Sequence, residues 1–226
     1  MTSELKVSII VPAYNEVDTI EAVLSRLLKV CQSLPSFEII VIDDGSTDGT
    51  AERVERFSSV RLVRQENQGK GAALRTGLRV SEGDIVVIQD ADMEYHPEDI
   101  PQLIEPILRG KADAVYGSRF KGNMDGMSFS HYIGNRLISL STKLLFGVSV
   151  TDVMTGHKAF RRKIFNPALI KENGFTVEIE ITARILKNRW RLIEIPIAYS
   201  YRKHGVAKIN YADGLRSLLK VIRERF

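Results

Sequence analysis

The sequence predicts an α/β fold in which helices cover both faces of a mainly parallel, doubly wound sheet. Two observations predict it: runs of β-branched residues alternate with segments of helical periodicity, and those runs are apolar throughout, as in strands buried on both faces. Strands that alternate with helices are joined by right-handed crossovers. With 226 residues, of which 44% are hydrophobic, the chain can bury a full core. We therefore expect one domain over residues 1–226.

Each predicted element has its own signal. The strands are Val- and Ile-rich runs bounded by polar or glycine-containing loops. They cover residues 7–11, 38–42, 60–63, 85–89 and 113–117. The helices have apolar residues spaced by three or four positions. They cover residues 18–32, 47–57, 71–80, 131–146 and 181–186, and Pro97 is typical of the first turn of a further helix.

Asp90-Ala91-Asp92 directly follows the apolar strand at 85–89. Open α/β sheets bind ligands at the carboxyl ends of their strands, so these carboxylates lie where a ligand would bind. Hard cations such as Mg²⁺ or Mn²⁺ bind carboxylate oxygens and keep substrate phosphates as further ligands. The motif thus favours a metal that holds a diphosphate. The alternative is that the aspartates cap the helix that starts near Pro97.

Two other strand ends carry loops of similar character. Residues 12–16 place an aromatic ring and an acid after the first strand, and residues 43–50 place an acidic pair after the second. In a parallel sheet these loops share an edge with residues 90–92, where together they could grip a nucleobase, a ribose and a diphosphate. Taken singly, they are equally typical of packing and turn chemistry. Lys70 lies between two glycines at the start of a predicted helix and is a candidate phosphate contact. The sequence contains neither a P-loop nor the glycine fingerprint of a dinucleotide-binding fold.

The net charge of +4 is divided unevenly along the chain. Residues 1–110 contain 11 Lys and Arg against 19 Asp and Glu, a net charge of −8, and residues 111–226 contain 21 against 9, a net charge of +12. The second half is therefore expected to face an anionic partner: a nucleic acid, a phosphorylated substrate or a membrane surface. Its C-terminal segment, 215–226, combines an apolar stripe with basic residues, which predicts either a helix on an anionic bilayer or a helix packed on the domain.

The chain contains a single cysteine, Cys31, and no apolar stretch of about 18 residues. The pattern of a signal peptide is missing ahead of the first strand. We therefore expect a cytoplasmic protein, which the basic C-terminal helix would bring to the inner face of the membrane.

Six segments of the chain belong together as a set. They are VSIIVPAYNE (7–16), VIDDGSTDGT (41–50), NQGKGAA (67–73), QDAD (89–92), YGSRF (116–120) and KAFR (158–161). In this order and spacing they resemble glycosyltransferase family two, with its GT-A (nucleotide-diphospho-sugar transferase) fold. Within that family they resemble the dolichol-phosphate mannose synthase-like branch of polyprenyl-phosphate glycosyltransferases.

The resemblance implies a donor site in residues 1–110. The nucleotide-sugar-binding residues that it implies, together with Lys70 from the loop chemistry, are Pro12, Tyr14, Glu16, Val41, Asp43, Asp90 and Ala91. It also implies that Asp90 and Asp92 hold Mg²⁺ or Mn²⁺ and the sugar diphosphate. Glu94 matches a position that can complete this metal site.

The resemblance implies an acceptor site in residues 111–226. Arg119 follows the strand at 113–117 and would face the donor. Arg136, Arg202 and Lys208 match basic positions that contact an acceptor phosphate, a role that suits arginine because its planar fork donates two parallel hydrogen bonds. Taken alone, each of these basic residues is more typical of a solvated surface charge.

Together these parts predict an inverting, metal-dependent glycosyltransferase that moves a hexose from a UDP or GDP sugar to a polyprenyl (dolichyl or undecaprenyl) phosphate. If the acceptor is instead a sugar or protein hydroxyl, a carboxylate must take its proton, and the candidates are Asp152, Glu178 and Glu180. The two glutamates are also typical of the first turn of a helix. From another class, a non-catalytic nucleotide-sugar or nucleic-acid binding module remains an alternative. The scattered basic residues do not favour nucleic acid.

Overall fold

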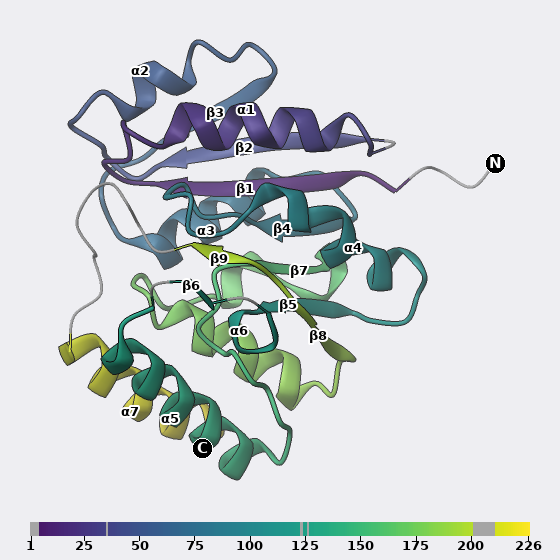
Figure 1. The fold of residues 1–226 in the computed structure, drawn as a ribbon, viewed down its shortest axis with the longest axis vertical. Coiled ribbons are helices and arrows are strands. Elements are labelled where there is room, and N and C mark those ends of the chain that lie inside the picture. The colour runs from purple at the N-terminus through teal and green to yellow at the C-terminus, as the bar shows by residue number, and fades with distance from the viewer. Residues whose placement is uncertain (1–4, 35, 123, 126, 201–210) are drawn as a thin grey trace.

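The computed structural model describes residues 5–34, 36–122, 124–125, 127–200 and 211–226. A seven-stranded sheet runs through the molecule in the order β3-β2-β1-β4-β7-β5-β8 (Figure 1). The strands are Val60–Arg64 (β3), Phe37–Asp43 (β2), Val7–Ala13 (β1), Ile85–Ile88 (β4), Lys158–Arg161 (β7), Ala114–Ser118 (β5) and Leu192–Pro196 (β8). Neighbouring strands are parallel, except that β7 is antiparallel to both β4 and β5. The predicted α/β fold with a mainly parallel sheet is confirmed.

The reversed strand β7 is an element that the sequence pattern does not reveal. It is four residues long and its sequence, KAFR, begins and ends with a basic residue. Lys158 is nevertheless fully buried, between Ile88 of β4 and Tyr116 of β5 in the sheet register. Because β7 runs backwards, it starts at the edge where the parallel strands end. A second small sheet pairs β6 (Met124–Asp125) with β9 (Tyr199–Ser200).

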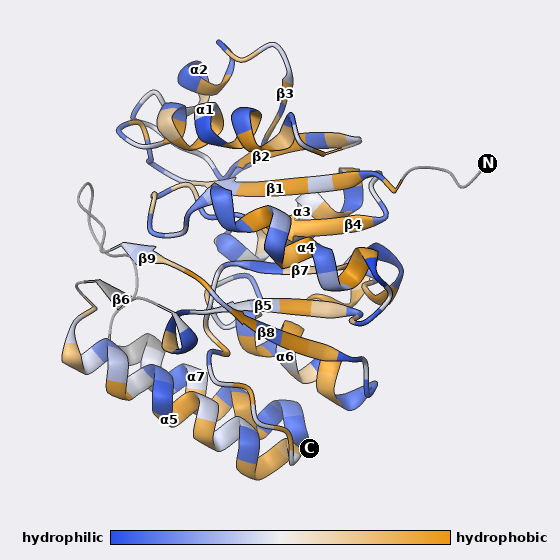
Figure 2. Cartoon of the chain, turned by 45° about the vertical axis from the view of Figure 1, so that its right-hand side comes forward, coloured by the Kyte–Doolittle hydropathy of each residue, from blue (hydrophilic) through white to orange (hydrophobic). Residues whose placement is uncertain are grey.

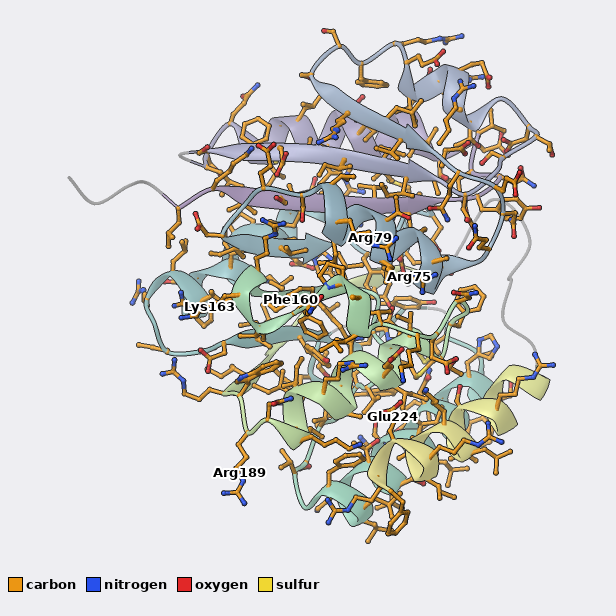
Figure 3. The ribbon with its side chains drawn as sticks, turned by 180° about the vertical axis from the view of Figure 1, so that it is seen from behind. Arg75, Arg79, Phe160, Lys163, Arg189 and Glu224 are labelled. Atoms are coloured by element: carbon orange, nitrogen blue, oxygen red, sulfur yellow. The ribbon has the colours of Figure 1, made fainter. Side chains whose placement is uncertain are left out.

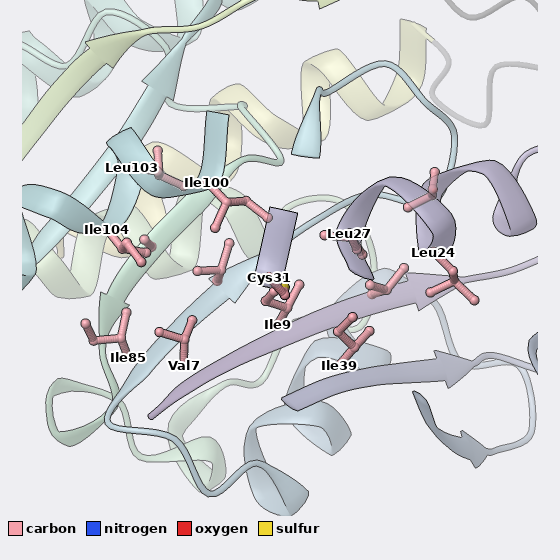
Figure 4. Packing of buried hydrophobic residues seen from close by; sticks show 14 of the residues in the cluster. Val7, Ile9, Leu24, Leu27, Cys31, Ile39, Ile85, Ile100, Leu103 and Ile104 are labelled. Atoms are coloured by element: carbon pink, nitrogen blue, oxygen red, sulfur yellow. The ribbon is translucent and has the colours of Figure 1, made fainter. Parts of the chain in front are cut away.

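Helices cover both faces of the sheet, as predicted. On one face, the core includes residues of α1 (Ile20–Cys31) and α4 (Ile100–Leu108), which pack on alternate residues of β1 such as Ile9 (Figure 4). On the other face, Ile10 packs with residues of α3 (Lys70–Val80) and α6 (Val177–Lys187). Figure 3 shows this side, with Arg75 and Arg79 labelled on α3. Burial on both faces explains why the central strands are apolar throughout. The helix predicted at 47–57 is shorter, Thr50–Val54 (α2).

Two helices, α5 (Phe129–Phe146) and α7 (Tyr211–Arg225), lie side by side at one end of the molecule (Figure 1). α5 turns Ile138, Ser139 and Thr142 toward the interior. The large apolar residues that recur along it are exposed instead: Phe129, Ile133, Leu137, Leu140 and Leu144. α7 buries Val221 and packs Leu218 against the core, whereas Leu219 and Ile222 are exposed, so its apolar residues both pack and face outward. Among the described residues, no helix has the length and apolar character needed to cross a membrane.

Candidate active site

The carboxyl ends of β1, β2 and β4 meet at one edge of the sheet. Ala13 and Asp43 are register partners at the ends of β1 and β2, and the Asp44 backbone N–H donates to the Ala13 carbonyl oxygen at 2.8 Å. β4 pairs with the other side of β1. The three loops that the sequence predicts to surround a nucleotide therefore emerge next to one another.

The first two of these loops are locked together by hydrogen bonds. Asn15 has a positive φ of 51°, a conformation that asparagine tolerates well. Its N–H donates to Ser46 Oγ and its Oδ1 accepts from Thr47 N, each at 2.9 Å. The two neighbours of Asn15 differ in exposure. Tyr14 is 36% exposed, and Glu16 is buried. The exposed ring of Tyr14 can stack on a base.

The remaining predicted nucleoside-site residues divide between the surface and the core. Pro12 is half-buried, and Asp43 is buried with Oδ1 accepting from Ser46 N at 3.3 Å. The side chains of Val41 and Ala91 instead belong to the hydrophobic core that packs against α1 and α4. The expected pocket-lining role does not fit these two side chains, because each faces the core. Only their backbone can face a nucleotide.

Asp44 also belongs to this site, although nothing in the sequence pattern distinguishes it from the other residues of its motif. Its carboxylate accepts hydrogen bonds from Gln65 Nε2 (2.7 Å), Gln68 N (3.0 Å) and Gly69 N (2.7 Å). Gly69 has a φ of 99°, which favours glycine. One carboxylate thus fixes the loop that leads into α3, whose first residue is Lys70.

Four side chains of alternating charge form a row near the end of β4: Lys158, Glu178, Lys70 and Asp90. Lys70 Nζ is 2.7 Å from Asp90 Oδ1 and 3.1 Å from Glu178 Oε1, and Glu178 also pairs with Lys158. Burial alone would lower the pKa of Lys70, but the carboxylates of Asp90 and Glu178 raise it above its usual value. Burial lowers the pKa of Lys158, although Glu178 opposes the change. Lys158 is held further by the Val153 carbonyl oxygen at 3.1 Å.

The backbone at Gly156 packs directly against two of these charged side chains, Asp90 and Lys70. A Cβ at this position would overlap Asp90 Oδ2 and lie 3.1 Å from Lys70 Nζ, so the close approach requires glycine. Gly156 N donates to the Tyr95 hydroxyl at 3.0 Å. The Tyr95 ring stacks on His157 with centroids 5.8 Å apart, and burial lowers the pKa of His157 to about 4. His157 is therefore neutral at physiological pH.

Arg119 lies beside this cluster, at the end of β5. Its Nε and Nη2 each donate to Asp152 at 2.8 Å, and its backbone N donates to the same carboxylate at 3.0 Å. The rings of Tyr95, Phe120 and Tyr199 surround the guanidinium at 5.5 to 6.0 Å. Burial alone would lower the pKa of Arg119, but Asp152 raises it well above its usual value. Arg119 is thus a fixed positive charge at the site.

The other predicted acceptor residues lie further out. Arg136 is exposed on α5, with its guanidinium 5.5 Å from the centroid of the Phe120 ring. Phe120 therefore lies within 6.0 Å of two arginines, the fixed Arg119 and the exposed Arg136. Arg202 and Lys208 lie outside the described residues.

The predicted metal-binding carboxylates each have a partner within the protein. Asp90 pairs with Lys70, Asp92 Oδ1 accepts from Glu94 N at 3.1 Å, and Glu94 Oε2 accepts from the Tyr199 hydroxyl at 3.1 Å. Within the described ranges, no three or more His, Cys, Asp or Glu side chains form a group that could hold a metal by themselves. A carboxylate pair fits a hard cation whose other ligands are diphosphate oxygens. Neither aspartate caps a helix, because the next helical turn starts at Pro97 and its cap position is His96.

The three acids considered as a general base are all engaged in structural contacts. Both oxygens of Asp152 accept from Arg119, and Glu178 lies between two lysines. Glu180 accepts from the backbone N–H groups of residues 171 and 172 and pairs with Arg184 at 3.0 Å. Each is at most 2% exposed. The geometry therefore does not support the role of proton acceptor for these carboxylates. Glu178 and Glu180 do lie in the first turn of α6, the alternative considered for them.

The fold and this edge of the sheet define a class of protein. A mainly parallel sheet with one reversed strand, and with acidic loops at its carboxyl edge, is the GT-A fold of nucleotide-diphospho-sugar transferases. The chain belongs to glycosyltransferase family 2, whose model, "Glycosyl transferase family 2", matches residues 8–168.

Two curated relatives illustrate the family. The dolichol-phosphate mannosyltransferase of Pyrococcus furiosus is 31% identical over 218 residues, which cover 91% of this chain and 59% of that protein. The undecaprenyl-phosphate 4-deoxy-4-formamido-L-arabinose transferase of Aeromonas hydrophila is 33% identical over 209 residues, which cover 89% of this chain and 62% of that protein. The chain thus spans less than two thirds of the length of either relative.

Solved structures share the fold. Glucosyl-3-phosphoglycerate synthase of Mycobacterium tuberculosis, in complex with phosphoglyceric acid, has a TM-score of 0.81 at 24% identity, covering 97% of this chain and 80% of that one. The same enzyme in complex with Mn²⁺, uridine diphosphate and glucosyl-3-phosphoglycerate has a TM-score of 0.76 at 26% identity, covering 97% of this chain and 78% of that one.

Proposed function

We propose that this chain transfers a hexose from a nucleotide-diphosphate sugar to a polyprenyl phosphate, with inversion at the anomeric carbon and with a divalent cation. The observation that carries the proposal is the cluster at the end of β4, where Asp90 and Lys70 lie 2.7 Å apart beside Asp92. Acidic and basic groups at the carboxyl edge of such a sheet suit a cation and a diphosphate. The names of the two curated relatives, which both act on a polyprenyl phosphate, support the acceptor class.

The donor residues have separate tasks in this proposal. The Tyr14 ring stacks on the base, and the buried Asp43 faces the ribose. Asp90 and Asp92 hold Mg²⁺ or Mn²⁺, which supplies Lewis-acid stabilisation of the departing diphosphate. The solved relative with Mn²⁺ and uridine diphosphate supports this ion and a uridine base. Lys70 stabilises the same negative charge from the N-terminus of α3.

The state of the nearby acids favours a phosphate acceptor over a hydroxyl. A phosphate oxygen is ionised at neutral pH and attacks without a general base, whereas a hydroxyl needs a carboxylate to take its proton. Asp152, Glu178 and Glu180 are each tied to basic or backbone groups. In the proposed step, an acceptor phosphate oxygen bonds to the anomeric carbon as the bond to the diphosphate oxygen breaks. The nucleoside diphosphate leaves with the bonding electrons, and attack from the opposite face inverts the configuration.

The α5–α7 end of the molecule supports a lipid-borne acceptor. In Figure 2, apolar residues recur along α5 on the outer side of the molecule, and Phe129 and Leu144 are 80% and 76% exposed. α5 contains no Asp or Glu, while Arg136 and Lys143 are exposed on it. An apolar stripe with basic neighbours fits the surface of an anionic bilayer. Arg136 also approaches the Phe120 ring, so this face reaches the site near Arg119.

A transfer assay tests the proposal. The purified protein is incubated with UDP- and GDP-hexoses, Mn²⁺ or Mg²⁺, and either undecaprenyl phosphate or free sugars. We expect product only with the lipid phosphate, of inverted configuration by NMR, and none from Asp92→Ala. Transfer to free sugars but not to the lipid would contradict the acceptor class, and full activity of Asp92→Ala would contradict the metal role.

A vesicle experiment tests the membrane contact separately. We expect the protein to sediment with phosphatidylglycerol vesicles at low salt and less at high salt, because its basic charges are screened. The exposed substitutions Leu137→Gln and Leu140→Gln should weaken this binding and leave thermal stability unchanged. Equal sedimentation of wild type and the double variant would refute the contact.

A further inference from the structure

A cation of the protein itself already occupies the position beside Asp90. Lys70 Nζ lies 2.7 Å from Asp90 Oδ1 and 3.0 Å from Asp90 Oδ2, so the ammonium group contacts both oxygens of the carboxylate. These are oxygens that the proposed divalent cation would need. Any cation that binds Asp90 must therefore compete with Lys70.

Glu178 and Lys158, the other two members of this row of charges, hold Lys70 in this place. Lys158 is fully buried in β7, donates hydrogen bonds to the carbonyl oxygens of residues 153 and 155, and lies 4.6 Å from the Tyr116 ring centroid. It fixes Glu178, which is 2% exposed and contacts Lys70 Nζ at 3.1 Å. Lys70 is the partly accessible member beside this buried pair, with 13% of its side chain exposed.

The charges of these four side chains determine which ions can enter the site. Two lysines and two carboxylates, Lys158, Glu178, Lys70 and Asp90, are already balanced. A divalent cation on its own would add two positive charges next to the Lys70 ammonium, and Asp92, the other proposed ligand, balances only one of them, which is unfavourable in a partly buried site. A divalent cation that arrives with a diphosphate adds no such excess, because the phosphate oxygens balance its charge and offer Lys70 a new anionic partner.

We propose that Lys70 is an exchangeable internal counter-ion of Asp90, which Glu178 and Lys158 position so that the divalent cation enters together with the nucleotide diphosphate and not before it. This inference rests on the proposed metal- and nucleotide-dependent function. Glu178 and Lys158 are then positioning residues, which act through Lys70 and touch neither substrate nor metal.

The test measures metal binding without turnover. The free Mn²⁺ signal in electron paramagnetic resonance is titrated with wild type and Lys70→Met, each with and without UDP. In wild type we expect weak binding of Mn²⁺ alone and much tighter binding with UDP. In Lys70→Met, Asp90 is released, so the affinity for Mn²⁺ alone should rise roughly tenfold or more while the enhancement by UDP shrinks.

Two further variants make the result specific. Lys29→Met removes one positive charge from an exposed position of α1 and should leave both Mn²⁺ affinities unchanged. Lys70→Gln removes the charge but keeps a polar side chain, and it should reproduce the effect of Lys70→Met if that variant does not fold.

The possible outcomes separate this inference from the proposed function. If neither Lys70→Met nor Lys70→Gln binds Mn²⁺ alone more tightly than wild type, the exchange of Lys70 for the cation at Asp90 is refuted. If wild type binds no Mn²⁺ even with UDP, the metal-dependent function itself is refuted, and the exchange with it. A UDP enhancement in wild type, together with tighter binding of Mn²⁺ alone by Lys70→Met and not by Lys29→Met, supports both.

Discussion

Asp152→Asn is expected to be strongly destabilising, although it changes the shape of the side chain very little. Arg119 directs Nε and Nη2 to the two Asp152 oxygens at 2.8 Å, and its side chain is only 8% exposed. The substitution removes the counter-charge and replaces one acceptor oxygen with an NH₂ group that faces a donor. Breaking a buried ion pair in this way costs about 3–5 kcal/mol. For a chain of this size that free energy corresponds to a fall in Tm of about 6–20 °C.

Urea unfolding followed by tryptophan fluorescence measures this loss, because the chain contains one tryptophan, Trp190. A matched control is Glu105→Gln, which breaks the exposed ion pair between Glu105 of α4 and Arg109, the residue that follows this helix. That pair is expected to contribute less than about 1 kcal/mol. If Asp152→Asn costs no more free energy of unfolding than Glu105→Gln, the buried pair does not have the importance we assign to it.

Three further predictions follow from the site. Gly156→Ala forces a methyl group against Asp90 and should abolish tight binding of UDP with Mn²⁺ in calorimetry. Gly134→Ala should bind normally, because a Cβ added there meets no described atom within 4 Å apart from the backbone around it in α5. Unchanged binding by both variants would contradict the close packing at Gly156. Burial lowers the pKa of His157 from 6.5 to about 4, so between these values the unfolded chain takes up a proton that the folded chain does not. The free energy of unfolding should therefore fall by up to about 1.4 kcal/mol per pH unit as the pH drops through this window, and this contribution should be missing from the urea curves of His157→Phe. Asp44→Asn leaves one of its backbone donors without an acceptor and should speed proteolysis of the loop before α3; an unchanged cleavage rate would argue against the anchoring role.

The parts of the fold that the sequence predicts are those with local signals. The central strands are apolar throughout because each is buried on both faces, and that pattern is visible in a few residues. β7 lacks such a signal, because its buried Lys158 is compensated by Glu178, which lies 20 residues further along the chain. A buried lysine looks like a surface lysine until its partner is known.

The candidate site was predictable to a similar extent. The convergence of residues 12–16, 43–50 and 90–92 follows from parallel topology and was expected. The pairing of Arg119 with Asp152 joins residues 33 positions apart, and no spacing rule indicates it. Helical periodicity correctly predicts α5, but periodicity alone does not tell whether an apolar stripe faces a core or faces outward.

The reversed direction of β7 has a consequence for how this protein can diversify. β5 ends and β7 begins at the same edge of the sheet, so the intervening chain, including all of α5, leaves and returns at one place. The length and composition of α5 can change without shifting any strand register, because Arg119, Asp152 and Gly156 lie outside this helix. The loops of residues 12–16 and 43–50, by contrast, are tied to one another at the ends of β1 and β2. In the proposed function, α5 is therefore an acceptor-facing module that can be exchanged on a constant donor-binding platform.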